Sequence, residues 1–288
     1  MQKQREGSQN RIAIITGAAR GIGRAAAIAL AKQGVDIVGI DICAPVCKRS
    51  GVKASTPDDL VETGKRVEAE GRRWKGEIQD QRDLSALRNI AKHVEEEWGG
   101  IDILFANAGI QEFRPLLELD DLEWQTHLDV NLTGTANTIR AFAPYLVKKG
   151  WGRIIVTGST QGRHGTKYGA AYSASKWGII GLMKSAALEL GPYGITVNAI
   201  IPGLINTPLT RHEERFAQIL EDAGKQPTGN LEDEKLAEQI LTVKTPLNVP
   251  WIEPEDVASV VVFLASDAAR MVSGATYDVT AGDSAHYM

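Results

Sequence analysis

Residues 11–24 read RIAIITGAARGIGR, and this stretch decides the fold. Residues 12–16 form a short run of apolar and β-branched side chains, which predicts a buried strand. Glycines follow at positions 17, 21 and 23, where an alanine-rich helical segment begins. Such glycines let the backbone approach a pyrophosphate, and the positive end of the helix dipole faces that charge. A strand, a glycine-rich turn and a helix in this order predict a dinucleotide-binding unit.

The rest of the chain repeats this alternation of short apolar runs and longer amphipathic segments. The predicted strands are residues 12–16, 36–41, 74–79, 101–106, 153–157, 196–201 and 275–279. The predicted helices are residues 21–32, 57–70, 83–98, 121–148, 170–190 and 254–265. Parallel strands joined by helices cross over with a fixed right hand. The pattern therefore predicts an α/β fold: a doubly wound parallel sheet of the Rossmann type in a three-layer α/β/α sandwich.

Nothing in the composition divides the chain, so we expect a single Rossmann-type domain over residues 1–288, with residues 1–10 as a flexible tail. Two long stretches interrupt the alternation, residues 42–56 and residues 204–249. The second contains charged helical pieces and ends before the last predicted helix. Long excursions at strand ends usually carry function, so we expect residues 204–249 to be an inserted substrate lid. The alternative is a solvated surface appendage.

The composition favours a small-molecule partner. A net charge of −4 gives no electrostatic reason to expect nucleic acid or an anionic membrane. The only two cysteines, Cys43 and Cys47, provide no disulfide framework and fall short of a four-ligand zinc site, so we expect no metal. No apolar run has membrane-spanning length, and the first ten residues do not resemble a signal peptide. We therefore expect a cytoplasmic protein.

Asp41 ends the second predicted strand, somewhat more than 20 residues past the first glycine. A carboxylate at this point can accept hydrogen bonds from the adenosine ribose hydroxyls, and it would repel a phosphate on that ribose. The sequence therefore favours NAD over NADP as the cofactor. Arg20 lies in the glycine-rich turn and softens this discrimination.

Six separately placed motifs resemble the short-chain dehydrogenase/reductase family in order and spacing. They are TGAARGIG at 16–23, ANAG at 106–109, Asn131, Ser159, YSASK at 172–176 and Pro202-Gly203. The resemblance spans nearly the whole chain and implies a nicotinamide-dependent oxidoreductase. Where the family often has a second asparagine this chain has Ala106, which removes one polar contact.

The resemblance also implies which residues bind the cofactor. The expected set is Gly17, Arg20, Gly21, Ile22, Gly23, Asp41, Asp80, Gln81, Asn107, Gly109, Tyr172, Lys176, Pro202, Gly203 and Thr207. Within it, Asp80 is expected to contact the adenine, and Asn107 and Gly109 border the two riboses.

Tyr172 and Lys176 are four residues apart in a predicted helix, so both side chains project from one face. A free tyrosine titrates near pKa 10, roughly three units too high for a base at neutral pH. A nearby ammonium and an oxidised nicotinamide ring would both favour the phenolate. Tyr172 is therefore the expected general acid/base. By the resemblance, Ser159 orients the reacting oxygen and Asn131 holds a water that relays protons from Lys176.

The loop positions of Gln111, Gln161 and His164 make them candidate substrate contacts. The long stretch after Asp41 and the ending YDVTAGD at 277–283 resemble the subgroup of carveol dehydrogenases and mycofactocin-coupled dehydrogenases. That resemblance implies an apolar, alicyclic, terpenoid-like secondary alcohol as substrate and a homotetramer. The alternatives are a 3-oxoacyl thioester reductase, a polyol or sugar dehydrogenase, and a sensor that binds NAD without catalysis.

Overall fold

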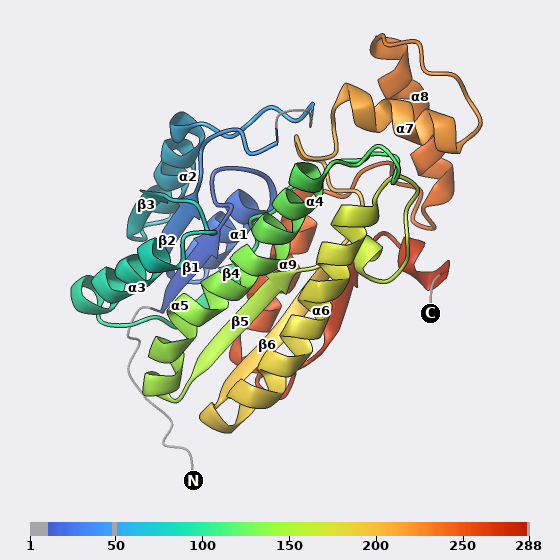
Figure 1. Cartoon of the computed structure of the whole chain (residues 1–288). Helices are drawn as coiled ribbons and strands as arrows, with labels where there is room; N and C mark the ends of the chain where they lie inside the picture. Colours follow the sequence, from blue (N-terminus) through green and yellow to red (C-terminus); the bar gives the residue numbers. More distant parts are fainter. Residues whose placement is uncertain (1–10, 48–50, 287–288) are drawn as a thin grey trace.

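A computed structural model of the protein describes residues 11–47 and 51–286, and within these residues seven parallel strands form one sheet (Figure 1). The strands are β1 (Ile12–Thr16), β2 (Asp36–Asp41), β3 (Trp74–Ile78), β4 (Ile103–Ala106), β5 (Gly152–Thr157), β6 (Ile195–Pro202) and β7 (Thr276–Val279). Their order in the sheet is β3-β2-β1-β4-β5-β6-β7. The predicted tail, residues 1–10, lies outside the described residues.

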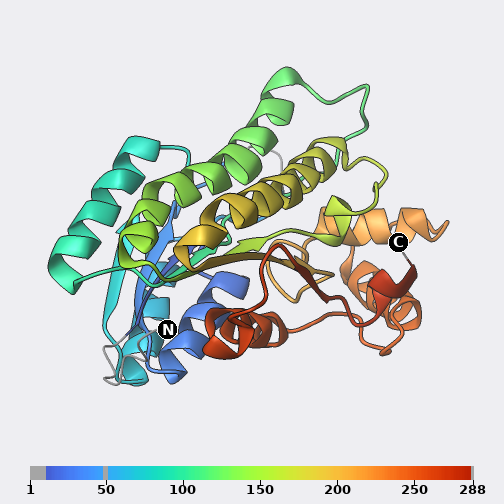
Figure 2. The same ribbon diagram turned by 90° about the horizontal axis from the view of Figure 1, so that it is seen from below.

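Helices cover both faces of this sheet (Figure 2). They are α1 (Gly21–Lys32), α2 (Pro57–Ala69), α3 (Leu84–Trp98), α4 (Asp121–His127), α5 (Gly134–Lys149), α6 (Ala170–Leu190), α7 (Glu213–Asp222), α8 (Leu231–Lys244) and α9 (Pro254–Ala265). One apolar core joins α3, α5 and α6 to the sheet, and a second core joins α1, α2 and α9 to the opposite face. The predicted three-layer, doubly wound α/β sandwich is confirmed.

The buried strands follow from their continuous apolar runs. Every residue of β1 is buried, with Ile14 in one core and Ala13 and Ile15 in the other, as the alternation of side chains along a strand requires. Strand β3 is only half-buried because it is an edge strand, and it carries the charged residues Lys75 and Glu77.

The predicted regular helix over residues 121–148 is wrong in its middle. Between α4 and α5 the chain forms a π-helical segment, Leu128–Thr133, whose wider turns contain the candidate residue Asn131. The sequence gives little sign of this, because the i to i+5 bonding depends on what the segment packs against. The other predicted helices and strands begin and end within three residues of their observed bounds.

The excursion after β6 forms α7 and α8, which pack on each other beyond the end of the sheet (Figure 1). A small apolar cluster of their own lies between them, and it includes Phe216, Leu241 and Trp251. None of the described helices is long and apolar enough to cross a membrane.

The sheet places the functional site. The strand order reverses at β1. From β1 the chain passes to β2 and β3 on one side of the sheet, and then crosses to β4 on the other side of β1. In doubly wound sheets the connections diverge at this point and leave a crevice at the carboxyl ends of the strands. The glycine-rich turn after β1 and the loop after β4 both open onto that crevice.

Trp74 supplies a test of the packing between α2 and the sheet. A Cβ added at Gly64 would lie 2.5 Å from Cδ1 and Nε1 of the Trp74 indole. We expect Gly64→Ala to lower the free energy of unfolding by about 1 to 3 kcal/mol, the usual cost of overpacking. Urea unfolding measures it. The matched control is Gly181→Ala in α6, where no heavy atom lies within 4 Å and alanine should leave stability equal or higher. Equal losses in both variants would contradict this interpretation.

Candidate active site

A continuous cavity runs along the carboxyl edge of the sheet, from the glycine-rich turn to the segment before α7. The predicted residues in its wall are Gly17, Arg20, Gly21, Ile22, Asp41, Asp80, Gln81, Asn107, Gly109, Gln111, Ser159, Gln161, His164, Tyr172, Lys176, Pro202, Gly203 and Thr207. Two predicted residues, Gly23 and Asn131, are not part of the wall.

The glycine-rich turn depends on conformations that other residues avoid. Gly17 has φ +70° and Gly21 has φ +56°, both in the left-handed region. At Gly23 a Cβ would collide with the carbonyl oxygen of Gly17. Gly23 therefore allows α1 to start against the turn and does not itself face the cavity.

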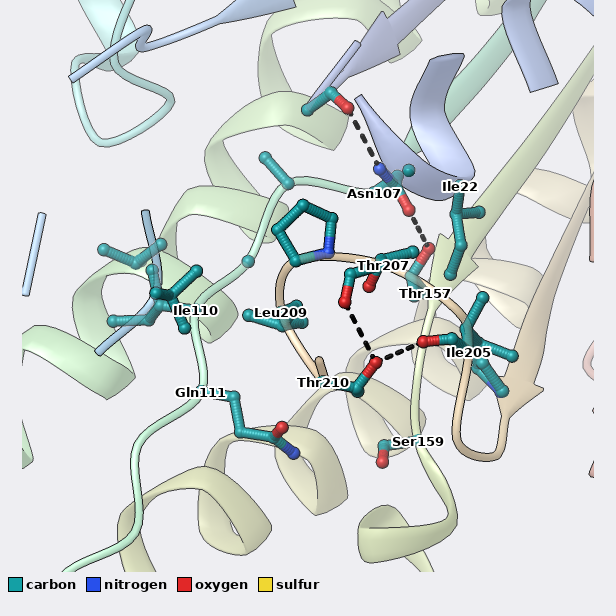
Figure 3. A pocket seen from close by; sticks show the side chains of 18 of the residues that line it. Ile22, Asn107, Ile110, Gln111, Thr157, Ser159, Ile205, Thr207, Leu209 and Thr210 are labelled. Atoms are coloured by element: carbon teal, nitrogen blue, oxygen red, sulfur yellow. Dashed lines mark hydrogen bonds between the residues drawn. The ribbon is translucent and has the colours of Figure 1, made fainter. Parts of the chain in front are cut away.

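Asn107 joins the ends of three strands (Figure 3). Its backbone N–H donates to Thr16 Oγ1 at 3.0 Å, and its Nδ2 donates to the Thr16 carbonyl at 3.1 Å. Its Oδ1 accepts from Thr157 Oγ1 at 3.0 Å. The side chain is thus already committed to β1 and β5, and it shapes the cavity wall from the end of β4.

Asp41 is buried, and both of its carboxylate oxygens are held. Oδ2 accepts from the Ala19 N–H at 3.0 Å, and Oδ1 accepts from the Cys43 N–H at 3.0 Å and from Ser55 Oγ at 2.8 Å. Ser55 belongs to the long stretch that follows β2. The carboxylate is therefore fixed at the cavity wall by the glycine-rich turn on one side and by that stretch on the other.

The two cysteines stay protonated thiols. Burial, followed by the Asp41 carboxylate, raises the pKa of Cys43 to about 12. Burial, followed by Glu112, raises the pKa of Cys47 to about 12. Among the described residues no group of His, Cys, Asp and Glu side chains could hold a metal ion.

Asp80 and Gln81 follow β3 and line the same cavity as Asp41. Asp80 is ion-paired with Arg82, with Oδ2 and Nη2 separated by 2.6 Å. Gln81 Nε2 donates to the carbonyls of Val130 at 2.8 Å and Ala108 at 3.1 Å. Gln81 thus ties the loop after β4 to the π-helical segment.

Ser159, Tyr172 and Lys176 converge at the other end of the cavity. Tyr172 is 6% exposed and Lys176 is 3% exposed. The Ser159 hydroxyl lies close enough to the Tyr172 hydroxyl to influence its ionisation. Lys176 Nζ donates to the Thr157 carbonyl at 2.9 Å and lies 5.5 Å from the centroid of the Tyr172 ring. One side chain from the loop after β5 and two from α6 therefore surround one point of the wall.

Burial controls the ionisation of this group. It raises the pKa of Tyr172, and the hydrogen bond to Ser159 and the charge of Arg215 act in the opposite direction. It also lowers the pKa of Lys176 to about 8. Within the protein itself, desolvation is therefore the largest influence on the Tyr172 pKa.

Asn131 lies in the π-helical segment and is fully buried. Its Oδ1 accepts from the Ile110 N–H at 2.9 Å, and its Nδ2 donates to the Ile110 carbonyl and to Ser175 Oγ, both at 3.0 Å. A Cβ on Gly109 would lie 3.0 Å from Asn131 Oδ1 and 3.6 Å from Lys176 Nζ. Asn131 therefore holds the loop after β4 against α6, immediately beside the lysine.

The family model for short chain dehydrogenase matches residues 11–218. The chain belongs to the short-chain dehydrogenase family. The (−)-trans-carveol dehydrogenase of Rhodococcus erythropolis is 37% identical over 278 residues, which cover 95% of this chain and 97% of that protein. An uncharacterized NAD-dependent oxidoreductase of Mycobacterium tuberculosis is 36% identical, covering 94% of this chain and 95% of that one. The crystal structure of carveol dehydrogenase from Mycobacterium avium in complex with NAD superposes with a TM-score of 0.88 at 37% identity, covering 95% and 97% of the two chains.

The outer part of the dehydrogenase cavity contains the three candidate substrate contacts. Gln161 is buried, and its Oε1 accepts from Ser173 Oγ at 3.4 Å. Gln111 is buried, and its Oε1 accepts no hydrogen bond from any described residue. His164 faces the carbonyl of Gly165 through Nδ1 at 3.0 Å. Apolar side chains, Ile110 and Leu209 among them, complete this part of the wall (Figure 3).

Sequence reasoning missed three polar residues of the site. Thr16 accepts from the Asn107 and Ala108 N–H groups, and Ser55 holds Asp41. Hydroxyl residues at strand ends and in loops are too common to single out. Arg215, on α7, lines the cavity from a segment that in sequence is one of several charged helical stretches.

The buried Lys176 of this dehydrogenase makes its stability depend on pH. The folded-state pKa of about 8 lies below the ordinary 10.5, so between these values the unfolded chain binds more protons than the folded one. Stability therefore rises with pH through this window. In the cofactor-free wild type, the free energy of unfolding should rise by on the order of 1 to 2 kcal/mol between pH 8 and pH 10, and Lys176→Met should abolish this rise. Urea unfolding at the two pH values measures it, with the exposed Lys32→Met as control. An identical pH dependence in wild type and Lys176→Met would refute the assignment.

Proposed function

We propose that this dehydrogenase transfers a hydride between NAD and a secondary alcohol or ketone whose body is apolar and alicyclic. The observation that carries the proposal is the convergence of Ser159, Tyr172 and Lys176 at one end of a cavity whose other end is a glycine-rich dinucleotide turn. The likeness to proteins named as carveol dehydrogenases supports the alicyclic substrate.

The residues of the turn fit the pyrophosphate of NAD. Arg20, the N-cap of α1, makes no side-chain hydrogen bond to the helix, and the first turn contains no acidic residue. The free N–H groups of this turn therefore face the cavity with the positive end of the helix dipole. The fixed carboxylate of Asp41 would receive the ribose hydroxyls, and its charge favours NAD over NADP.

Once bound, NAD supplies the hydride acceptor at C4 of its nicotinamide ring. Tyr172 takes the proton from the substrate hydroxyl as general base, and in ketone reduction it returns that proton. Ser159 hydrogen-bonds the same oxygen and orients it. The positive ring and the Lys176 ammonium favour the phenolate against the effect of burial. We assign Asn131 to the proton path from Lys176 to solvent, since the two side chains meet beside Gly109.

The segment 204–249 acts as a lid in this proposal. Leu204 and Leu209 contribute apolar wall, and α7 lies directly after them. We further propose a homotetramer, since large apolar side chains such as Leu122, Trp177 and Leu188 are exposed on the outer faces of α4 and α6. The free thiols of Cys43 and Cys47 suit a reducing, cytoplasmic compartment.

The catalytic assignment predicts that alicyclic secondary alcohols reduce NAD in the presence of the protein and that Tyr172→Phe lowers kcat at least about 1,000-fold, in the range of a lost general base. Affinity for NADH should change less than about threefold, because the phenyl ring keeps the packing. Absorbance at the reduced nicotinamide band follows turnover, and NADH fluorescence follows binding.

Polyols and 3-hydroxyacyl thioesters are tested in the same assay. If the enzyme turned over either of them faster than alicyclic alcohols, that compound class would replace the proposed substrate class. Appreciable turnover by Tyr172→Phe would refute the role of Tyr172, and binding without turnover of any substrate would favour an NAD sensor.

The role of Asp41 predicts a shift in cofactor choice. Asp41→Asn keeps an acceptor for Ser55 and removes the charge that repels a ribose phosphate, so the ratio of kcat/KM with NAD to that with NADP should fall at least about tenfold. Asp58→Asn, in the exposed first turn of α2, removes the same charge away from the cavity and should leave the ratio unchanged. An equal effect of the two substitutions would mean that the general charge, and not the contact at Asp41, sets the preference.

A further inference from the structure

Arg215 places a buried cation in the wall of a cavity whose lining also includes the charged residues Lys176, Lys244 and Asp283. The residue is 8% exposed, and it lines the same cavity as Ser159 and Tyr172. Its guanidinium carbon lies 4.6 Å from the centroid of the Phe113 ring. Stacking on an aromatic face holds the planar group in one orientation.

The neighbours of Arg215 position it without satisfying it. Gln218 Nε2 donates to the Lys167 carbonyl at 3.3 Å, so its Oε1 is left to accept from Arg215 Nη1. The described residues offer Arg215 Nε no hydrogen-bond acceptor. Nη1 of the guanidinium is thus anchored, whereas Nε has no partner among the described residues.

Among the described residues, no carboxylate compensates this charge at close range. Asp222 acts on Arg215 only through space, and Asp283, which lines the same cavity, is not among the groups that act on it. Burial lowers the pKa of Arg215 to about 10, which leaves the group charged at neutral pH. A buried cation normally requires a paired anion.

We propose that the substrate of this dehydrogenase carries a carboxylate, bound by Arg215, in addition to the secondary alcohol or ketone that reacts at Tyr172. The inference rests on the proposed function and narrows its substrate class to alicyclic hydroxy acids and oxo acids. The guanidinium fork matches a carboxylate and supplies charge-assisted hydrogen bonds. The apolar body of the substrate then lies against Leu204 and Leu209, between the carboxylate and the reacting carbon. Binding at two ends fixes which face of that carbon meets the hydride acceptor.

A binding experiment tests Arg215 without requiring turnover. Calorimetry compares 4-oxocyclohexanecarboxylate with 4-oxocyclohexanecarboxamide on the complex with NAD, a combination of oxidised cofactor and ketone that cannot react. The wild type should bind the carboxylate at least tenfold more tightly than the neutral amide, and Arg215→Met should abolish this preference. The amide also represents a neutral acyl group, so equal binding of the two compounds by the wild type would overturn the proposal.

Arg211→Met is the matched control. It removes the same charge from the segment just before α7, but Arg211 pairs with Glu234 and Glu238, stacks on Trp251 and is not part of the cavity wall. The carboxylate preference should survive in this variant. Its loss in both variants would overturn the specific role of Arg215. If Arg215→Met does not fold, Arg215→Lys retains the charge without the planar fork and should show an intermediate preference, and an unchanged preference there would also contradict a fork-held carboxylate.

Kinetics separates the failure of this inference from that of the proposed function. The cis and trans isomers of 4-hydroxycyclohexanecarboxylate are compared with those of 4-methylcyclohexanol, using NAD. Oxidation of the methyl compound without any advantage for the acid would refute the carboxylate and leave the alicyclic alcohol dehydrogenase standing. A carboxylate preference in binding, without oxidation of either compound, would support the role of Arg215 and count against the proposed reaction. The expected result is a kcat/KM at least tenfold higher for one isomer of the acid, lost in Arg215→Met.

Discussion

The hydrogen bonds of Asn107 hold the carboxyl ends of β1, β4 and β5 together, and the rest of the site depends on this junction. Asn107 meets Thr16 on one side and Thr157 on the other. The Thr157 carbonyl in turn receives Lys176 Nζ. A single amide therefore links the strand that leads into the glycine-rich turn to the strand whose last carbonyl binds the lysine. Because Thr16, Thr157 and Lys176 are buried and Asn107 is partly buried, these hydrogen bonds are costly to lose, and the distance between the two ends of the cavity is correspondingly well defined.

Much of this architecture could be predicted from the chain itself. The bounds of β1, β2, α1, α6 and α9 follow from uninterrupted apolar runs and from Gly, Pro and polar residues at their ends, where local preference and tertiary structure agree. The positions of Tyr172 and Lys176 on one helix face follow from helix periodicity alone. Local sequence is sufficient for such features because the fold satisfies the same requirements that the sequence expresses.

The features that escaped prediction depend on contacts between distant parts of the chain. The π-helical segment around Asn131 exists because its side chain bonds to Ile110, which belongs to a different loop. Two further features follow only from contacts in the folded chain: the tight packing of Gly23 on Gly17, and the burial that raises the pKa of Tyr172. Arg215 is the clearest case, since in sequence it is one more charged residue of an amphipathic helix, and only its stacking on Phe113 distinguishes it.

The apolar cluster between α7 and α8 is separate from the two cores that hold the sheet. We therefore expect substitutions on the cavity-facing side of α7 to change which substrates the enzyme accepts without loosening the two cores that hold the sheet. This separate packing makes substrate preference an evolvable property under the proposed function, because one short segment can vary while the cores that hold the sheet are inherited unchanged.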